Sequence, residues 1–153
     1  MTNASGKPRK RAGKIVLLSL AGLLFALALA FFAYTQDYYH ADATAAALVK
    51  DNPNIRQQGN LTILSPDSSN DTGAGLIFYP GGKVEETAYL PLLEQLRQGG
   101  LTCVLVKMPF RLAVFDIRAA DAVYAQFPAI SRWYLAGHSL GGAMASSYVP
   151  GNE

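Results

Sequence analysis

Residues 132–142 read RWYLAGHSLGG, and this stretch decides the fold. It joins a strand-like segment to a Gly-x-Ser-x-Gly pattern centred on Ser139, and the helix-forming segment GAMASSY follows. A serine that projects from the end of a strand requires a sharp turn, in which flanking glycines approach other backbone too closely for a Cβ. The pattern therefore predicts a nucleophile elbow, with Ser139 as catalytic nucleophile and Gly137 and Gly141 as elbow glycines. The alternative is a glycine-rich turn with an inert serine.

A second glycine-containing turn, Tyr79-Pro80-Gly81-Gly82, ends an earlier apolar run. The backbone N–H of Leu140, at the start of the helix after the serine, has no intrahelical acceptor, and we expect it to donate to an oxyanion. An oxyanion hole needs a second N–H, which comes from the loop after an earlier strand. We expect Gly82 to supply it, or one of its neighbours Gly81 and Lys83. An ordinary Pro-Gly turn is the alternative.

Apolar runs of strand length alternate with amphipathic segments along the second half of the chain. We expect strands at 61–66, 75–80, 102–109 and 132–137, and helices at 86–98 and 117–127. This alternation indicates βαβ units and a parallel sheet that helices cover on both faces. On the first helix the solvated side is expected to carry Glu85, Glu86, Glu94, Arg97 and Gln98.

Other polar residues have simpler interpretations. Asp116 is expected to cap the helix 117–127 rather than to serve as a catalytic acid. His138 adjoins the serine on a tight turn, so it is expected to pack or hydrogen-bond beside the elbow rather than to act as its base. His40 is interpreted as an interfacial or linker residue, and the single Cys103 as a buried thiol.

Residues 15–34, IVLLSLAGLLFALALAFFAY, carry no charge. A helix of this length covers about 30 Å of hydrocarbon, which predicts a transmembrane anchor in contact with membrane lipid. A cleaved signal peptide is the alternative, although its small-x-small sites lie inside the apolar run. The positive-inside rule places the N-terminus in the cytoplasm and the remaining chain outside it, because cations precede the run: Lys7, Arg9, Lys10, Arg11 and Lys14.

The net charge of +2 comes from that N-terminal cluster. The rest of the chain is slightly acidic, so no electrostatic footprint for nucleic acid is expected. The chain is expected to divide into a basic cytoplasmic terminus (1–14), the anchor (15–34), a linker with a short helix (35–60) and a domain at 61–153.

Two stretches, GLIFYPGGKVEETAYLPLLEQLRQGGLTCVLVKMPFRLAVFD and RWYLAGHSLGGAMASSY, resemble the alpha/beta-hydrolase superfamily. The resemblance is greatest to its dienelactone-hydrolase-related group, which often follows a membrane anchor, and covers residues 45–149. It implies a three-layer α/β fold with an eight-stranded, mostly parallel sheet. It also implies that Ser139 attacks an ester or related acyl bond of a small molecule, with no metal or organic cofactor. Leu140 and the Gly81-Gly82 loop would form the oxyanion hole.

The sequence departs from that family after the elbow helix. The family's order is Ser, then Asp or Glu, then His, and no acid or histidine here lies in a position to serve. Domain 61–153 is therefore expected to be the N-terminal part of a hydrolase domain, truncated after the elbow helix and inactive or weakly active alone. The alternatives are a membrane-tethered pseudo-hydrolase that binds a ligand or partner, and a partner chain that completes the triad.

Overall fold

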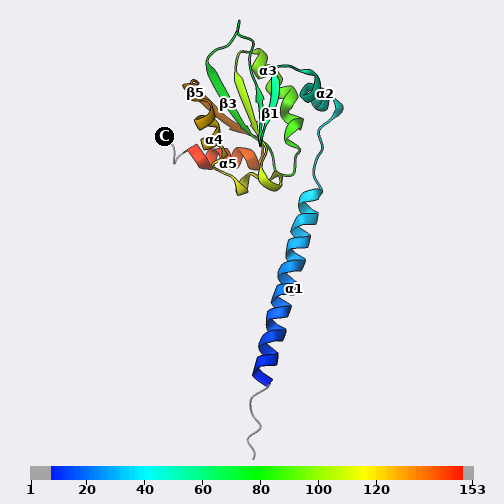
Figure 1. Ribbon diagram of the computed structural model, residues 1–153. Helices are drawn as coiled ribbons and strands as arrows, with labels where there is room; N and C mark the ends of the chain where they lie inside the picture. The colour runs from blue at the N-terminus through cyan, green and yellow to red at the C-terminus, as the bar shows by residue number, and fades with distance from the viewer. Residues whose placement is uncertain (1–7, 150–153) are drawn as a thin grey trace, which may run out of the picture. The chain divides into compact units, whose positions relative to one another are not determined.

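The computed structural model describes residues 8–149, and the chain divides into two compact units, Met1–Asp37 and Tyr38–Glu153. The first unit contains helix α1, Pro8–Gln36 (Figure 1). The most apolar 18-residue window of its span Arg11–Gln36 has a mean hydropathy of 2.8, and none of that window is buried. This helix is long and apolar enough to cross a membrane, although a signal sequence would meet the same criterion.

The second unit is built on a mixed sheet whose described strands follow the order β1-β2-β4-β3-β5 (Figure 1). The strands are β1 Ile55–Gln58, β2 Leu61–Leu64, β3 Ala74–Tyr79, β4 Thr102–Val106 and β5 Arg132–Gly137. β3 runs parallel to both β4 and β5, as expected for βαβ units. β1 and β2 form an antiparallel hairpin, and β2 pairs antiparallel with β4, so the sheet is not wholly parallel.

Helices cover both faces of this sheet, which gives three layers (Figure 1). Side chains alternate along β3, because successive residues of a strand point to opposite faces. Leu76 and Phe78 pack with residues of α2 (Ala43–Asp51) and α3 (Leu90–Gln98). Ile77 and Tyr79 pack with residues of α4 (Ala119–Gln126) and α5 (Leu140–Tyr148).

Short 3-10 helices lie in the loops at the carboxyl ends of β3 and β4. They are η1 Glu86–Tyr89, η2 Pro109–Arg111 and η3 Ala113–Phe115. The expected single helix over 86–98 is therefore a 3-10 turn followed by α3, which has Pro91 in its first turn. Proline is tolerated there because the first N–H groups of a helix have no intrahelical acceptor.

Three expectations about this unit were wrong. The segment 35–60 is not a linker throughout, because β1 lies within it and joins the sheet. β1 has one apolar residue, Ile55, and its other three residues are exposed at the sheet edge, so it lacks a strand pattern. Asp116 does not cap α4: the N-cap is Arg118, and the backbone carbonyl of Asp116 accepts from the Ala119 N–H.

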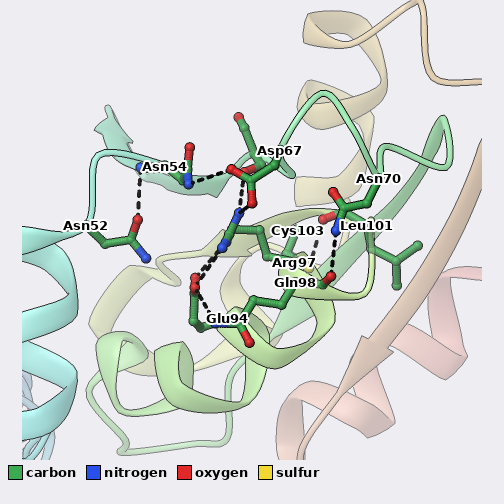
Figure 2. Close-up of polar contacts among 10 residues, drawn as sticks. Asn52, Asn54, Asp67, Asn70, Glu94, Arg97, Gln98, Leu101 and Cys103 are labelled. Atoms are coloured by element: carbon green, nitrogen blue, oxygen red, sulfur yellow. Dashed lines mark hydrogen bonds and ion pairs between the residues drawn. The ribbon is translucent and has the colours of Figure 1, made fainter.

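The third error concerns the polar side of the expected helix 86–98, since Glu86, Glu94 and Arg97 are buried rather than solvated. Arg97 donates to both carboxylate oxygens of Glu94, at 2.9 and 3.0 Å, and lies 3.2 Å from Asp67 in the loop after β2 (Figure 2). Burial alone would raise the pKa of Glu94, but hydrogen bonds from Arg97 and Gln98 outweigh it and lower that pKa.

The same loop is attached to its surroundings by two asparagines (Figure 2). The amide of Asn54 donates to Asp67 at 3.2 Å, and the amide of Asn70 donates to the Gln98 carbonyl at 2.6 Å. These contacts, with Glu94 and Arg97, form what we call the Arg97 network. It fastens the 65–73 loop to the C-terminal end of α3, at the amino ends of β3 and β4.

Candidate active site

The turn after β5 has the backbone of a strained elbow. Ser139 stands between the end of β5 and the start of α5 with φ 50° and ψ −120°. Residues other than glycine seldom adopt positive φ, because the Cβ then lies too close to the backbone. Residues with such strain are concentrated at functional sites. Ser139 is exposed, so the turn presents its side chain at the carboxyl end of the sheet.

The glycines that flank this serine have no room for a side chain. A Cβ on Gly137 would lie 2.6 Å from the backbone of Gly141 and Gly142. A Cβ on Gly141 would lie 2.2 Å from the carbonyl oxygen of Tyr79 and 2.3 Å from that of Pro80. Because these neighbours are backbone atoms, they cannot move aside as a flexible side chain would. The spacing of the motif therefore follows from the close packing of β5, α5 and the end of β3.

The hydrogen bonds of the loop after β3 separate the three candidate oxyanion donors. The Gly81 N–H donates to the Tyr89 hydroxyl at 3.0 Å, and the Lys83 N–H donates to the Arg111 carbonyl at 3.0 Å. Among residues 8–149, no acceptor bonds the N–H of Gly82 or that of Leu140. A Cβ on Gly82 would lie 3.0 Å from the Leu140 side chain, so these two residues are neighbours.

His138 is attached to the same loop by both its backbone and its ring. Its N–H donates to the Tyr79 carbonyl at 3.1 Å, and its Nδ1 lies 2.9 Å from the Tyr89 hydroxyl. It therefore hydrogen-bonds beside the elbow, as its position next to the serine suggested.

The first residues of the second unit support the loop from another side. Tyr39 bridges to Val84 as a short parallel strand: its N–H donates to the Lys83 carbonyl at 2.9 Å, and the Glu85 N–H donates to its carbonyl at 2.8 Å. The Arg111 guanidinium lies 3.4 Å from the centre of the Tyr38 ring, a cation–π contact. Sequence reasoning missed this support, because backbone hydrogen bonds leave no side-chain pattern.

Glu85 fastens the same segment through its carboxylate. It accepts from the Ala41 N–H at 3.0 Å, and that hydrogen bond is the main reason that the pKa of Glu85 is lowered. His40, interpreted from the sequence as an interfacial or linker residue, lies 3.4 Å from the same carboxylate. His40, one of the two histidines in the chain, therefore contacts Glu85 rather than Ser139.

Tyr79, at the end of β3, is fully buried, and its hydroxyl joins two elements. It donates to the Ile117 carbonyl at 3.0 Å and accepts from the Ala120 N–H, in the first turn of α4, at 2.8 Å. Burial raises its pKa to about 12, so the phenol stays protonated at neutral pH. Through these two hydrogen bonds Tyr79 fixes α4 to the sheet.

Within the part of the chain that the structure describes, the Ser139 hydroxyl has no hydrogen-bond partner. The Tyr148 hydroxyl donates to Asp121, and the Arg118 guanidinium donates to it at 2.8 Å. These two hydrogen bonds lower the pKa of Asp121. Residues 8–149 contain no group of acids, histidines and cysteines placed to hold a metal ion. The described residues thus supply an elbow and two unengaged N–H donors, but no acid–histidine pair at the serine.

The open side of β5 carries a groove of about 270 Å³ between this strand and α5. Among the described strands β5 pairs with β3 alone, so its other edge is unpaired. The groove is lined by Leu135, Ala136, Gly137, Gly142, Ala145, Ser146 and Val149.

One comparison with known proteins gives a match. The model of the alpha/beta hydrolase family matches residues 75–153, more than half of the chain, from β3 through the elbow. No curated protein and no solved structure matches the chain significantly.

Proposed function

The chain belongs to the alpha/beta hydrolase family, and from that premise we propose that it is a serine hydrolase acting on ester or related acyl bonds of a small molecule. The observation that carries the proposal is the pair of unengaged N–H groups of Gly82 and Leu140, on neighbouring residues beside the strained Ser139. Two backbone donors on neighbouring residues are suited to stabilise an oxyanion without reorganising.

In the proposed reaction the Ser139 hydroxyl oxygen attacks the acyl carbon and loses its proton to a base. The Gly82 and Leu140 N–H groups bind the negative oxygen of the tetrahedral intermediate. The alcohol leaves with that proton, and water then releases the acid from the serine. We propose that the base and its acid come from outside the described residues, either from a longer chain that this sequence begins or from a partner.

Covalent labelling with a fluorophosphonate tests this proposal. The full 153-residue chain in detergent micelles is expected to react slowly at Ser139, since an oxyanion hole without a base leaves about 10³–10⁴-fold acceleration over water. Ser139→Ala should abolish labelling. Ser146→Ala is the matched control, because it removes an α5 hydroxyl that donates to the Gly142 carbonyl.

A second function, ligand binding without catalysis, is favoured by the lack of a partner for the Ser139 hydroxyl among residues 8–149. It predicts a folded chain whose serine is never labelled, even after the gene's reading frame beyond codon 153, or a co-expressed partner, supplies candidate acids and histidines. Faster, Ser139-dependent labelling in such a completed protein would reject this alternative.

We also propose that α1 anchors the protein in a membrane, as a single-pass span with the N-terminus in the cytoplasm. The support is the apolar span of α1 and the cations that precede residue 15. A membrane-impermeant maleimide on intact cells should label Ser69→Cys but not Ser5→Cys. Cys103 gives no background, because it is buried, which raises its thiol pKa to about 12. Labelling of Ser5→Cys alone would reverse the orientation.

A further inference from the structure

We propose that the Tyr89 hydroxyl is a positioning group that sets the spacing of the two oxyanion donors by joining the loop after β3 to the elbow. This inference rests on the proposed function of Gly82 and Leu140. Tyr89 touches neither donor N–H directly. It acts through Gly81, which precedes Gly82, and through His138, which lies two residues before Leu140.

The hydroxyl of Tyr89 contacts both the loop after β3 and the elbow. It accepts the Gly81 N–H at 3.0 Å and lies 2.9 Å from His138 Nδ1. Because the phenol oxygen already accepts from Gly81, its own proton is available for Nδ1. One hydroxyl thus connects a backbone N–H of the loop to a side chain of the elbow.

The fit around this connection is close. A Cβ on Gly81 would lie 2.8 Å from the Tyr89 oxygen and 2.8 Å from His138 Nδ1. The Tyr89 ring also packs on Phe78 of β3, at 4.9 Å between ring centres, which holds the hydroxyl in place. Gly81, Tyr89 and His138 therefore form one tightly packed group between the two turns.

The connection also determines which N–H group of the loop stays unengaged. Tyr89 takes the Gly81 N–H and the Arg111 carbonyl takes the Lys83 N–H, so Gly82 between them keeps its donor. Without the Tyr89 hydroxyl, the Gly81 N–H would lose its acceptor and the loop its bond to His138. The Gly81 and Gly82 N–H groups would then compete for the oxyanion, and the distance between the Gly82 and Leu140 N–H groups would no longer be fixed.

The variant Tyr89→Phe tests this role, since it removes the hydroxyl and keeps the ring on Phe78. The rate constant for fluorophosphonate labelling of Ser139 in the full chain should fall about tenfold, less than the 10²–10³-fold expected on removal of an oxyanion donor itself. Tyr134→Phe, which removes a hydroxyl from the half-exposed ring of Tyr134, is the matched control and should label at the wild-type rate. Gly81→Ala should slow labelling as Tyr89→Phe does, by pushing the two rings apart.

A second measurement does not depend on serine reactivity. In the full chain in micelles, with glycine and histidine labelled with ¹⁵N, Tyr89→Phe should speed exchange of the Gly81 amide proton at least tenfold and shift the His138 Nδ1 resonance. Circular dichroism should stay unchanged. Unaltered Gly81 exchange in Tyr89→Phe overturns the inference, as does an unaltered labelling rate in a chain that labels.

The two proposals can fail separately. If the wild type never labels at Ser139, even when completed, the proposed hydrolase function fails. The exchange and ¹⁵N data then decide alone whether Tyr89 joins the two turns.

Discussion

The two ends of the parallel strands are held by different means. At the carboxyl ends the elbow and the loop after β3 meet through backbone contacts, with Gly137 and Gly141 against carbonyl and peptide atoms. At the amino ends the 65–73 loop also has backbone contacts, since the Thr72 N–H donates to the Gly100 carbonyl and a Cβ on Gly100 would lie 2.2 Å from the Asn70 carbonyl oxygen. The side-chain charges of the Arg97 network are added to these contacts at that end. A backbone contact tolerates no added atom, whereas an ion pair tolerates changes of shape but not the loss of one partner. The crowded elbow glycines lie at the end where chemistry is proposed, and the buried ion pair lies at the opposite end.

The largest expected effect comes from adding one methyl group to the elbow. In Gly141→Ala the Cβ meets two carbonyl oxygens at 2.2 and 2.3 Å, and we expect a loss of more than about 3 kcal/mol in unfolding free energy. Gly137→Ala should cost less, and Gly142→Ala least, because its nearest backbone atom is 3.0 Å away. Thermal and urea unfolding measure the series. Equal losses in unfolding free energy at the three glycines would contradict the conclusion that backbone crowding determines the structure of the elbow.

Removal of one partner tests the other end. Arg97→Met leaves Glu94 buried without its cation, and we expect a loss of about 3 kcal/mol in unfolding free energy. The double variant with Glu94→Leu should recover most of it, since no buried charge then remains. Arg118→Met is the matched control: its pair with Asp121 is exposed and screened by solvent, so its loss should change the unfolding free energy far less than Arg97→Met does. If the double variant did not recover the lost stability, packing rather than charge would hold this end.

Tyr79 tests how much a side chain contributes at the carboxyl ends of the strands. Tyr79→Phe removes the hydroxyl that bridges the Ile117 carbonyl and the Ala120 N–H, and we expect a loss of about 2 kcal/mol in unfolding free energy. Tyr134→Phe, at the half-exposed edge, should stay within about 0.5 kcal/mol. A loss as large as that of Gly141→Ala would show that this end depends on side chains as well.

The smallest expected effect is a pH dependence at the amino ends. The folded-state pKa of Glu94 is lowered from its ordinary value of 4.5, so its ionised form favours the folded state. Its contribution is present in full above pH 4.5 and is lost as pH falls through the lower folded-state pKa. The difference in unfolding free energy between wild type and Glu94→Gln should therefore shrink below pH 4.5, as acid titrations of both would show. A constant difference would count against the ion pair.

The sequence predicted the parallel part of the fold well, because β3 and β4 are buried on both faces and almost wholly apolar, and because β5, although only partly buried, is apolar after Arg132. Strands β3, β4 and β5 and the helices between them lie close to their predicted positions. β1 was missed because a half-exposed edge strand needs few apolar residues. Glu94 and Arg97 were misplaced because a charged pair on a helix has the same pattern whether it faces solvent or a loop.

The candidate site divides in the same way. The close packing of Gly137 and Gly141 could be predicted, because glycine at both positions of the Gly-x-Ser-x-Gly spacing indicates backbone crowding. The separation of Gly82 from its neighbours could not, because it depends on acceptors from distant parts of the chain, the Tyr89 hydroxyl and the Arg111 carbonyl. The support from Tyr39 is likewise made of main-chain bonds, which any residue could form.

Gly75 of β3 makes room for the tryptophan of β5. A Cβ there would lie 2.3 Å from the ring of Trp133, so the missing side chain on β3 leaves a seat for the indole of β5. The chain has a single tryptophan, and Tyr124 and Phe127 meet its ring edge-to-face at 5.9 and 6.1 Å. The protein therefore carries an intrinsic fluorophore on the strand that leads to Ser139. Its emission reports, without any added label, whether that strand is seated against β3 and α4.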